Sequence, residues 1–356
     1  MIVIFLFFIF NYLLFYDHFT YKNILYFNHN TAEKITVIIP AKNEEEKIGQ
    51  LLKSLVSKYI DEIIVVNDLS DDNTENEVKK FKHVKLINIS NKPKGYTGKN
   101  YALLQGYKHS KNKNLLFLDA DTYVSNDINF DKILLDFLNN NDKVYSALPY
   151  YQTKNYVEKL SCIFCIIVSM AFTKFNFNNS LHGSCILISK DLYEKIGTHF
   201  VIKNEVVEDM ALANLLKQNN IKIKRFLGRN IISFRMYTNL NNIIEGWSKN
   251  IAKGFKHNSI INTIAIVLFI CSIFAVLYHC VELILYGQVL YSILLYTLLS
   301  FVVYMYSYRI ISINLFESLG IGFYIIFFLA IFLYSTYLTL LKRKVKWKGN
   351  DIFLNN

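Results

Sequence analysis

The chain has 356 residues, a formal net charge of +11 at pH 7, 53% hydrophobic residues and a mean hydropathy of +0.23. This apolar content is too high for a wholly soluble protein of one or two domains, so part of the chain is expected in lipid. Lys and Arg are scattered without a basic stripe that carries stacking aromatics, which argues against nucleic acid as a partner. A basic protein beside a membrane fits attraction to anionic lipid and the retention of Lys and Arg on the cytoplasmic side.

The first apolar stretch, residues 1 to 18, is interpreted as an N-terminal membrane anchor. It has no basic n-region and no small-residue cleavage site, which favours a retained anchor over a removed signal peptide. It is shorter than the about 20 apolar residues that a spanning helix needs. It therefore either borrows flanking aromatic residues at the interface or lies partly within one leaflet.

Residues 30 to 257 are interpreted as a soluble α/β domain. Short apolar, β-rich runs alternate with amphipathic segments, a pattern typical of a mostly parallel sheet covered by helices. Ligands of such sheets bind beyond the carboxyl ends of the strands. Polar residues follow three of the expected strands: 40–44, 67–68 and 119–121. An apolar stretch inside this region, residues 160–173, is too short to cross a bilayer and is expected to be an interfacial or core helix.

The run LLFLDADT, residues 115–122, places Asp119 and Asp121 directly after an apolar strand. Alternate strand residues point the same way, so the two carboxylates are expected to share a face. Carboxylates with open coordination positions suit Mg or Mn, a cation that also grips a diphosphate and neutralises it as it leaves. The alternative interpretation is a pair of capping or turn aspartates.

Two further runs are weaker signals when each stands alone. In VVNDLSDDNT, residues 65–74, the carboxylate of Asp68 could accept hydrogen bonds from a base or ribose, although such a run is more often plain turn and cap chemistry. In GYTGKNYALLQG, residues 95–106, Lys99 could offer charge to a phosphate ahead of a helix. This run lacks the spacing of a P-loop, and a Gly-Lys pair is usually a solvated turn.

Taken together, these runs resemble the family 2 inverting glycosyltransferases with the GT-A fold, from about residue 35 to residue 256. The matching segments stand in the family's order: IPAKNEE (39–45), NDLSDDNT (67–74), GKNYALLQG (98–106), LDADT (118–122), HGSCILIS (182–189) and VVEDMALA (206–213).

The resemblance implies a role for each matched residue. It places Pro40, Ala41, Glu44 and Asp68 around the nucleotide of the sugar donor, with Lys99 nearby and Asp119 also in contact with the donor. It assigns Asp119 and Asp121 to the DxD motif that binds the metal. Asp209 would be the general base that takes the acceptor proton, with Glu208 as the weaker candidate. The alternative for this pair is a helix N-terminus carrying carboxylates that suit the helix dipole.

The run EGWSKNIAKGF, residues 245–255, occupies the place where processive members of the family carry a Q-x-x-R-W signature. That signature is missing here, which favours transfer of a single sugar over polymer synthesis. Trp247 either stacks on the acceptor or sugar or anchors the domain at the membrane interface. Within the family, the short anchor, the TGKNYA and GWSKN runs and the C-terminal helices are most similar to enzymes that glucosylate a carotenoid acid from UDP-glucose.

Residues 258 to 342 are interpreted as C-terminal transmembrane helices, with spans near 259–283, 288–308 and 318–341, followed by a basic tail at 343 to 356. Three crossings would place this tail outside a membrane whose inner face carries the catalytic domain, against the positive-inside tendency. One stretch is therefore re-entrant or interfacial, or the number of spans differs.

The sequence thus predicts a multi-pass enzyme of the cell membrane with its catalytic domain facing the cytosol. It would transfer a hexose, with UDP-glucose as the expected donor, to an apolar acceptor embedded in the bilayer, with inversion. One alternative is a processive polysaccharide synthase. Another is a catalytically inactive membrane protein that binds nucleotide sugars, since fold alone does not establish function.

Overall fold

The structure is a computed structural model that describes residues 31–171, 181–257, 260–347 and 350–353. The predicted N-terminal anchor, residues 1 to 18, lies outside the described residues. The chain divides into two compact units, called here the sheet unit and the helical unit. Of the described residues, the sheet unit comprises 31–150 and 181–235, and the helical unit comprises 151–171, 236–257, 260–347 and 350–353.

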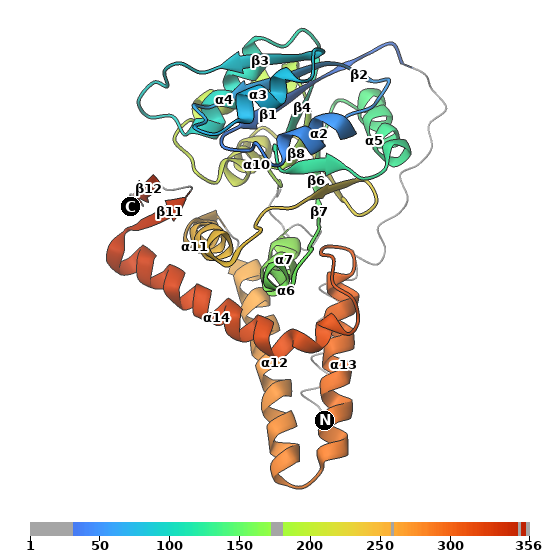
Figure 1. Cartoon of the computed structure of the whole chain (residues 1–356), viewed down its shortest axis with the longest axis vertical. Helices are drawn as coiled ribbons and strands as arrows, with labels where there is room; N and C mark the ends of the chain where they lie inside the picture. Colours follow the sequence, from blue (N-terminus) through green and yellow to red (C-terminus); the bar gives the residue numbers. More distant parts are fainter. Residues whose placement is uncertain (1–30, 172–180, 258–259, 348–349, 354–356) are drawn as a thin grey trace. The chain divides into compact units, whose positions relative to one another are not determined.

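A seven-stranded sheet in the order β3-β2-β1-β4-β8-β6-β9 forms the core of the sheet unit (Figure 1). All neighbouring strands pair in parallel except β8, which runs antiparallel to β4 and to β6. The predicted α/β fold with a mostly parallel sheet is therefore confirmed. The strands are β1 (Ile35–Ala41), β2 (Ile60–Asn67), β3 (Val84–Asn88), β4 (Asn114–Leu118), β6 (Val144–Leu148), β8 (Cys185–Ser189) and β9 (Ile223–Leu227).

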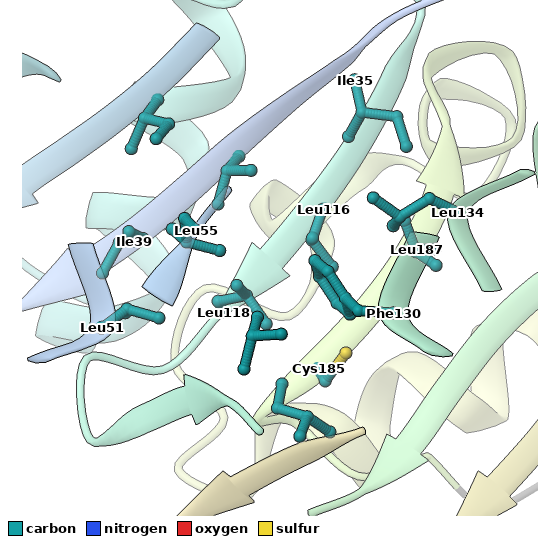
Figure 2. Packing of buried hydrophobic residues seen from close by; sticks show 14 of the residues in the cluster. Ile35, Ile39, Leu51, Leu55, Leu116, Leu118, Phe130, Leu134, Cys185 and Leu187 are labelled. Carbon is teal, nitrogen blue, oxygen red and sulfur yellow. The ribbon is translucent and has the colours of Figure 1, made fainter. Parts of the chain in front are cut away.

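Helices cover both faces of this sheet because its central strands are apolar on both sides. Odd-numbered residues of β1, such as Ile35 and Ile39, pack with α2 and α5 on one face, where Leu51 and Phe130 are buried (Figure 2). Ile38 points to the other face and packs with α4 and α10. The helices of this unit are α2 (Ile48–Ser54), α3 (Thr74–Lys79), α4 (Gly98–Lys108), α5 (Asp127–Asn139), α8 (Lys190–Lys195), α9 (Thr198–Val201) and α10 (Glu208–Gln218).

The strand order changes direction between β1 and β4. The chain builds β2 and β3 on one side of β1 and then crosses to form β4 on the other side. The paired residues of β1 and β4 end at Ile38 and Phe117, whereas β1 continues beside β2 to Ala41. Pro40 lacks an N–H donor and stands beyond the last pair with β4, where none is needed. Such a switch point is where ligands bind in open α/β sheets.

A smaller sheet in the order β5-β10-β7 begins directly after the Asp119 to Asp121 segment. Its strands are β5 (Thr122–Val124), β10 (Ile232–Phe234) and β7 (Tyr150–Tyr151). β5 begins directly after Asp121 and pairs antiparallel with β10, so that Thr122 stands opposite Phe234. This pairing holds the chain immediately after the Asp119 to Asp121 segment.

Among the described residues, the helical unit contains three helices that are long and apolar enough to span a membrane: Thr263–Leu285, Val289–Ser307 and Glu317–Lys342. They correspond to the predicted spans near 259–283, 288–308 and 318–341. The unit's elements are α6 (Tyr156–Lys159), α7 (Cys162–Ala171), α11 (Leu240–His257), α12 (Ile260–Leu285), α13 (Val289–Ser307), η1 (Glu317–Gly320), α14 (Ile321–Tyr337), η2 (Leu338–Lys342), β11 (Lys344–Trp347) and β12 (Asn350–Phe353).

α7 lies in the predicted 160–173 stretch and forms part of the core of this unit. Cys162, Ile163 and Ile166 are fully buried. The ring of Phe164 stacks on the Trp247 indole of α11 at 4.7 Å and lies 5.0 Å from the Phe328 ring of α14. The expectation of a helix too short to cross but apolar enough for a core is confirmed.

Candidate active site

The Asp-Ala-Asp segment leaves the end of β4 with its two carboxylates half-exposed and Ala120 buried between them. Backbone hydrogen bonds hold each end of the segment. The Asp119 N–H donates to the Ser184 carbonyl at 3.2 Å, and the Arg235 N–H donates to the Asp121 carbonyl at 3.2 Å. The alternating burial is what the extended chain predicts, with both aspartates on the more open side.

Lys99 is the central cation of the site. Its Nζ lies 2.6 Å from Asp119 Oδ1 and 2.6 Å from Glu208 Oε1. It stands in the first turn of α4, whose start is set by the Thr97 side chain accepting a hydrogen bond from the Asn100 N–H. Burial opposes the charge of Lys99, but the two carboxylates outweigh burial and raise the pKa of the ammonium. Lys99 is therefore charged and links the end of β4 to the start of α10.

Glu208 and Asp209 begin α10, where carboxylates also suit the positive end of the helix dipole. The Asp209 carboxylate accepts the Gly183 N–H at 3.0 Å and the Met210 N–H at 2.8 Å, so its orientation is held by backbone donors. Burial, and then the negative charge of Glu208, raise the pKa of Asp209 to about 6, against the opposing pull of Lys99. A carboxylate with this pKa is suited to act as a base near neutral pH.

The HGSC segment, residues 182–185, leads into β8 and lies next to Glu208 and Asp209. A Cβ on Gly183 would lie 3.0 Å from Glu208 Oε1 and 3.3 Å from Asp209 Cβ, so only glycine fits without displacement. His182 beside it is half-buried and lies edge-on to the Phe234 ring at 6.0 Å. Burial and the Lys99 charge lower the pKa of His182 to about 4, although Asp119 and Glu208 act in the opposite direction. The imidazole is consequently neutral at pH 7.

Asp68 occupies a tight position just past the end of β2. Its N–H donates to the Ala41 carbonyl at 2.8 Å, which ties it to the end of β1. Its side chain is buried, at 5% exposure, and Oδ1 has no hydrogen-bond partner within the described chain. A Cβ on Gly98 would lie 1.8 Å from Asp68 Oδ2, so the first residue of α4 approaches this carboxylate closely. An unsatisfied buried carboxylate oxygen is costly and is suited to accept a donor from a ligand.

Pro40, Ala41 and Glu44 are the remaining residues predicted to bind the nucleotide. Pro40 and Ala41 end β1, and Glu44 stands in the segment that follows it. The Glu44 N–H donates to Thr74 Oγ1 at 2.8 Å, and the Glu44 carbonyl accepts N–H donors from Lys47 and Ile48 at the start of α2. These contacts position the segment, and its binding to a nucleotide stays a prediction.

Two carboxylates at the end of β4 fit a site for Mg or Mn that is completed by substrate. Within the described parts of the chain, no group of three or more His, Cys, Asp or Glu residues converges as a metal cage. Mg binds through one or two carboxylates together with substrate phosphates and water, so Asp119 and Asp121 suffice as the protein's share. The donor set is all oxygen, as a hard cation requires.

Trp247 belongs to the helical unit and is buried, at 5% exposure. Its indole N–H donates to Ser161 Oγ at 3.0 Å, and its ring stacks on Phe164. These contacts give it a structural role within that unit. The predicted contact with the acceptor is untested and stays a prediction.

Sequence reasoning did not assign roles to Gly183 or Asn100. Asn100 is fully buried, and its side-chain amide donates to the carbonyls of Ile202 at 2.7 Å, Lys203 at 3.4 Å and Glu205 at 3.0 Å. It thus ties the start of α4 to the segment that leads into Glu208. These contacts join residues about a hundred positions apart in the sequence. A polar residue next to Lys99 was the one local feature of the sequence that pointed to them.

Comparison with known proteins agrees with this geometry. Residues 36–197 match the family model described as glycosyl transferase family 2. This segment of the chain is therefore similar to family 2 glycosyltransferases, and the fold is of the GT-A class.

One curated relative is the 4,4'-diaponeurosporenoate glycosyltransferase of Staphylococcus aureus, 28% identical over 239 residues that cover 65% of this chain and 63% of the relative. The match thus spans less than two thirds of that protein's length. Among solved structures, the mannosyltransferase of Pyrobaculum calidifontis in complex with GDP-Man and Mn2+ matches with a TM-score of 0.50 and 13% identity, over 94% of this chain and 99% of that one. Glucosyl-3-phosphoglycerate synthase from Mycobacterium tuberculosis matches with a TM-score of 0.41 and 18% identity, over 64% and 78% of the two chains.

Proposed function

We propose that this protein transfers a hexose from a nucleotide-diphosphate sugar, with UDP-glucose as the expected donor, to an apolar acceptor in the membrane, with inversion. The observation that carries the proposal is the convergence of Lys99, Asp119, Glu208 and Asp209 within a domain similar to family 2 glycosyltransferases. These side chains come from three separate segments that meet beyond the carboxyl end of β4.

The donor side of the reaction is assigned to the ends of β1, β2 and β4. Pro40, Ala41 and Glu44 would border the nucleotide, and the unsatisfied Oδ1 of Asp68 would accept an N–H or O–H from its base or ribose. Mg or Mn bound through Asp119 and Asp121 would supply positive charge that stabilises the departing diphosphate. Lys99 adds a fixed positive charge beside the same carboxylate.

The acceptor side of the reaction is assigned to Asp209. Its carboxylate would take the proton of the acceptor as the acceptor oxygen attacks the anomeric carbon opposite the diphosphate, which inverts that carbon. The two backbone N–H donors from Gly183 and Met210 keep the carboxylate in place. Glu208 is better placed to hold Lys99, because its Oε1 already pairs with that ammonium at 2.6 Å.

An apolar acceptor follows from the long apolar helices and from the name of the relative, whose acceptor is a carotenoid acid. An acceptor dissolved in the bilayer would be presented to an enzyme held at the same surface. The catalytic domain would face the cytosol, where nucleotide sugars are made, and the enzyme would be a multi-pass protein of the cell membrane.

The proposal is tested with detergent-purified protein, membrane lipid extract and UDP-glucose, UDP-GlcNAc or GDP-mannose in turn, with Mn or EDTA. We expect release of nucleoside diphosphate from one donor that stops with EDTA. Asp121→Ala should reduce this release by about 10²-fold or more, whereas Asp127→Ala, at an exposed position of α5, should not. Equal turnover in both variants would refute the metal assignment, and silence of the unaltered enzyme with every donor would refute the transfer activity.

A further inference from the structure

The cations around the three long apolar helices are unevenly distributed. The turn between α12 and α13, residues 286–288, contains no Lys or Arg. α11 precedes the first long helix and carries Lys249, Lys253 and Lys256. If all three helices crossed, the tail would lie on the opposite side from α11, against the tendency of Lys and Arg to share the cytoplasmic side. That tail starts with five cations at the end of the third helix: Lys342, Arg343, Lys344, Lys346 and Lys348.

The third helix, α14, packs mainly against elements that do not cross a bilayer. At its start, Tyr296 Oη of α13 also donates to the Leu319 carbonyl of η1 at 2.6 Å. Ser335 Oγ of α14 donates to the Ser248 carbonyl of α11 at 2.7 Å. The Phe328 ring lies 5.0 Å from Phe164 of α7. At the other end, Glu317 of η1 pairs with Lys159 of α6. α14 is therefore fastened to α6, α7 and α11 along its length.

The helices that pack against α14 limit how deep in the bilayer it can lie. α6 has 4 residues and α7 has 10, fewer than the about 20 that a crossing needs. α11 is long enough in residues, but it is amphipathic and includes three lysines, which are strongly disfavoured in the hydrocarbon centre. A helix packed against these three elements lies at their depth, near the membrane surface. Figure 1 shows α14 running across the direction of α12 and α13.

α12 and α13 are long enough to cross a bilayer, and each is the other's main packing partner. They pack against each other, and Ser292 Oγ of α13 donates to the Cys280 carbonyl of α12 at 2.8 Å. Toward their turn the apolar side chains are open, with Leu285 at 80% and Leu290 at 67% exposure. Exposed apolar surface on a helical hairpin of this length requires lipid around it.

We propose that α12 and α13 cross the membrane as a hairpin while α14 lies within the leaflet on the side of α11, so that the basic tail returns to that side. The number of crossings after residue 257 is then even. α11 packs against β11, which belongs to the basic tail. The cations of α11 and of the tail then lie at the same membrane surface. Anionic lipid headgroups are the partner that fits these cations.

The test uses the full chain with one cysteine added at a time and a membrane-impermeant maleimide, applied to intact cells and to inverted vesicles. The added cysteines are Asp142→Cys in the sheet unit, where the side chain is 73% exposed, Gln288→Cys in the exposed hairpin turn, and one cysteine appended after Asn356. The unaltered chain is the control, because Cys162, Cys165, Cys185 and Cys280 are buried and Cys271 lies within α12. If Cys271 reacts, Cys271→Ser becomes the background.

We expect the appended cysteine and Asp142→Cys to react from one membrane side and Gln288→Cys from the other. Labelling of the tail from the side of Gln288→Cys would mean that α14 crosses, and it would overturn the proposal. Labelling of all three from one side would show that the hairpin does not cross and would overturn it too. The readout does not depend on sugar transfer, so loss of the proposed activity would leave it unaffected.

Discussion

The ammonium of Lys99 organises the site at the residue scale. It lies between Asp119, which is proposed to act on the donor side, and Glu208, which precedes the proposed base. An ammonium shared by two carboxylates offsets their repulsion, and it also draws the start of α4 toward the start of α10. In the proposed reaction, the positive charge beside the departing diphosphate and the position of Asp209 are therefore coupled through one side chain.

The pH dependence of turnover should follow Asp209. Its pKa is raised to about 6, so the carboxylate is the ionised base above this pH and takes up a proton as the pH falls through 6. We expect kcat to fall by about tenfold for each pH unit below 6. The kcat of purified enzyme between pH 4.5 and 8.5 is the measurement, and a flat profile through pH 6 would contradict the assignment.

The Asp209→Asn variant should separate catalysis from folding. We expect kcat to fall by about 10²- to 10⁴-fold. A raised folded-state pKa means that the ionised carboxylate destabilises the fold above pH 6, and this effect disappears as the pH falls toward the unfolded value of 3.8. Thermal unfolding of Asp209→Asn at pH 8 should thus occur at the same or a higher temperature. A strongly lowered Tm would indicate a structural role.

The contact between Gly98 and Asp68 should control donor binding. The Cβ of Gly98→Ala would collide with Asp68 Oδ2 and displace a carboxylate whose Oδ1 is buried without a partner in the described chain. We expect the donor KM to rise by about tenfold, which corresponds to one lost hydrogen bond to a charged group. The control is Gly49→Ala in α2, where a Cβ meets nothing within 4 Å. Equal KM values for the two variants would exclude Asp68 from donor binding.

At the scale of elements, the site depends on how α4 is fastened to the segment before α10. The Thr97 N–H donates to the Lys203 carbonyl at 2.8 Å, and the Asn100 amide donates to the carbonyls of Ile202, Lys203 and Glu205. The Asn100 Oδ1 has no partner within the described chain, so the position favours asparagine for its N–H donors. This clamp sets the separation of Lys99 and Glu208.

Asn100→Ala should therefore reduce kcat as well as stability. Loss of the amide leaves carbonyl groups less satisfied, and movement of about 1 Å between α4 and α10 would lower kcat by about 10²-fold. Asn114→Ala is the matched control, because Asn114 is also buried with an unsatisfied Oδ1 and donates to Glu33 Oε2 at 2.8 Å, at the opposite end of β4. It should lower Tm comparably and leave kcat within about twofold. Equal kcat in both variants would remove the clamp from the catalytic argument.

At the scale of the whole molecule, the sheet unit carries the chemistry and the helical unit carries the long apolar helices. An acceptor confined to the same lipid phase is encountered by two-dimensional diffusion. In mixed micelles with a membrane lipid extract, the transfer rate should follow the mole fraction of acceptor at the micelle surface and not its bulk concentration. Dilution with detergent at constant bulk acceptor should lower the rate, whereas an unchanged rate would indicate a water-soluble acceptor.

The sequence by itself determined the order of strands and helices, the carboxylates at the end of β4 and the three long apolar helices. These features depend on local periodicity and on residue type, which neighbouring residues reveal. It also singled out Asp68, Lys99 and Asp119, because each follows a strand or stands near a helix start, whereas Asp209 came from the resemblance to family 2 glycosyltransferases.

Only the tertiary structure decided which of these residues meet. The Lys99 pairs with Asp119 and Glu208, the approach of Gly98 to Asp68 and the Asn100 clamp join segments far apart in the chain. The burial of Trp247 against Ser161 and Phe164, and the packing of α14 beside helices too short to cross, likewise depend on distant partners. Long-range packing and desolvation set these contacts, and neither leaves a periodic signal in the local sequence.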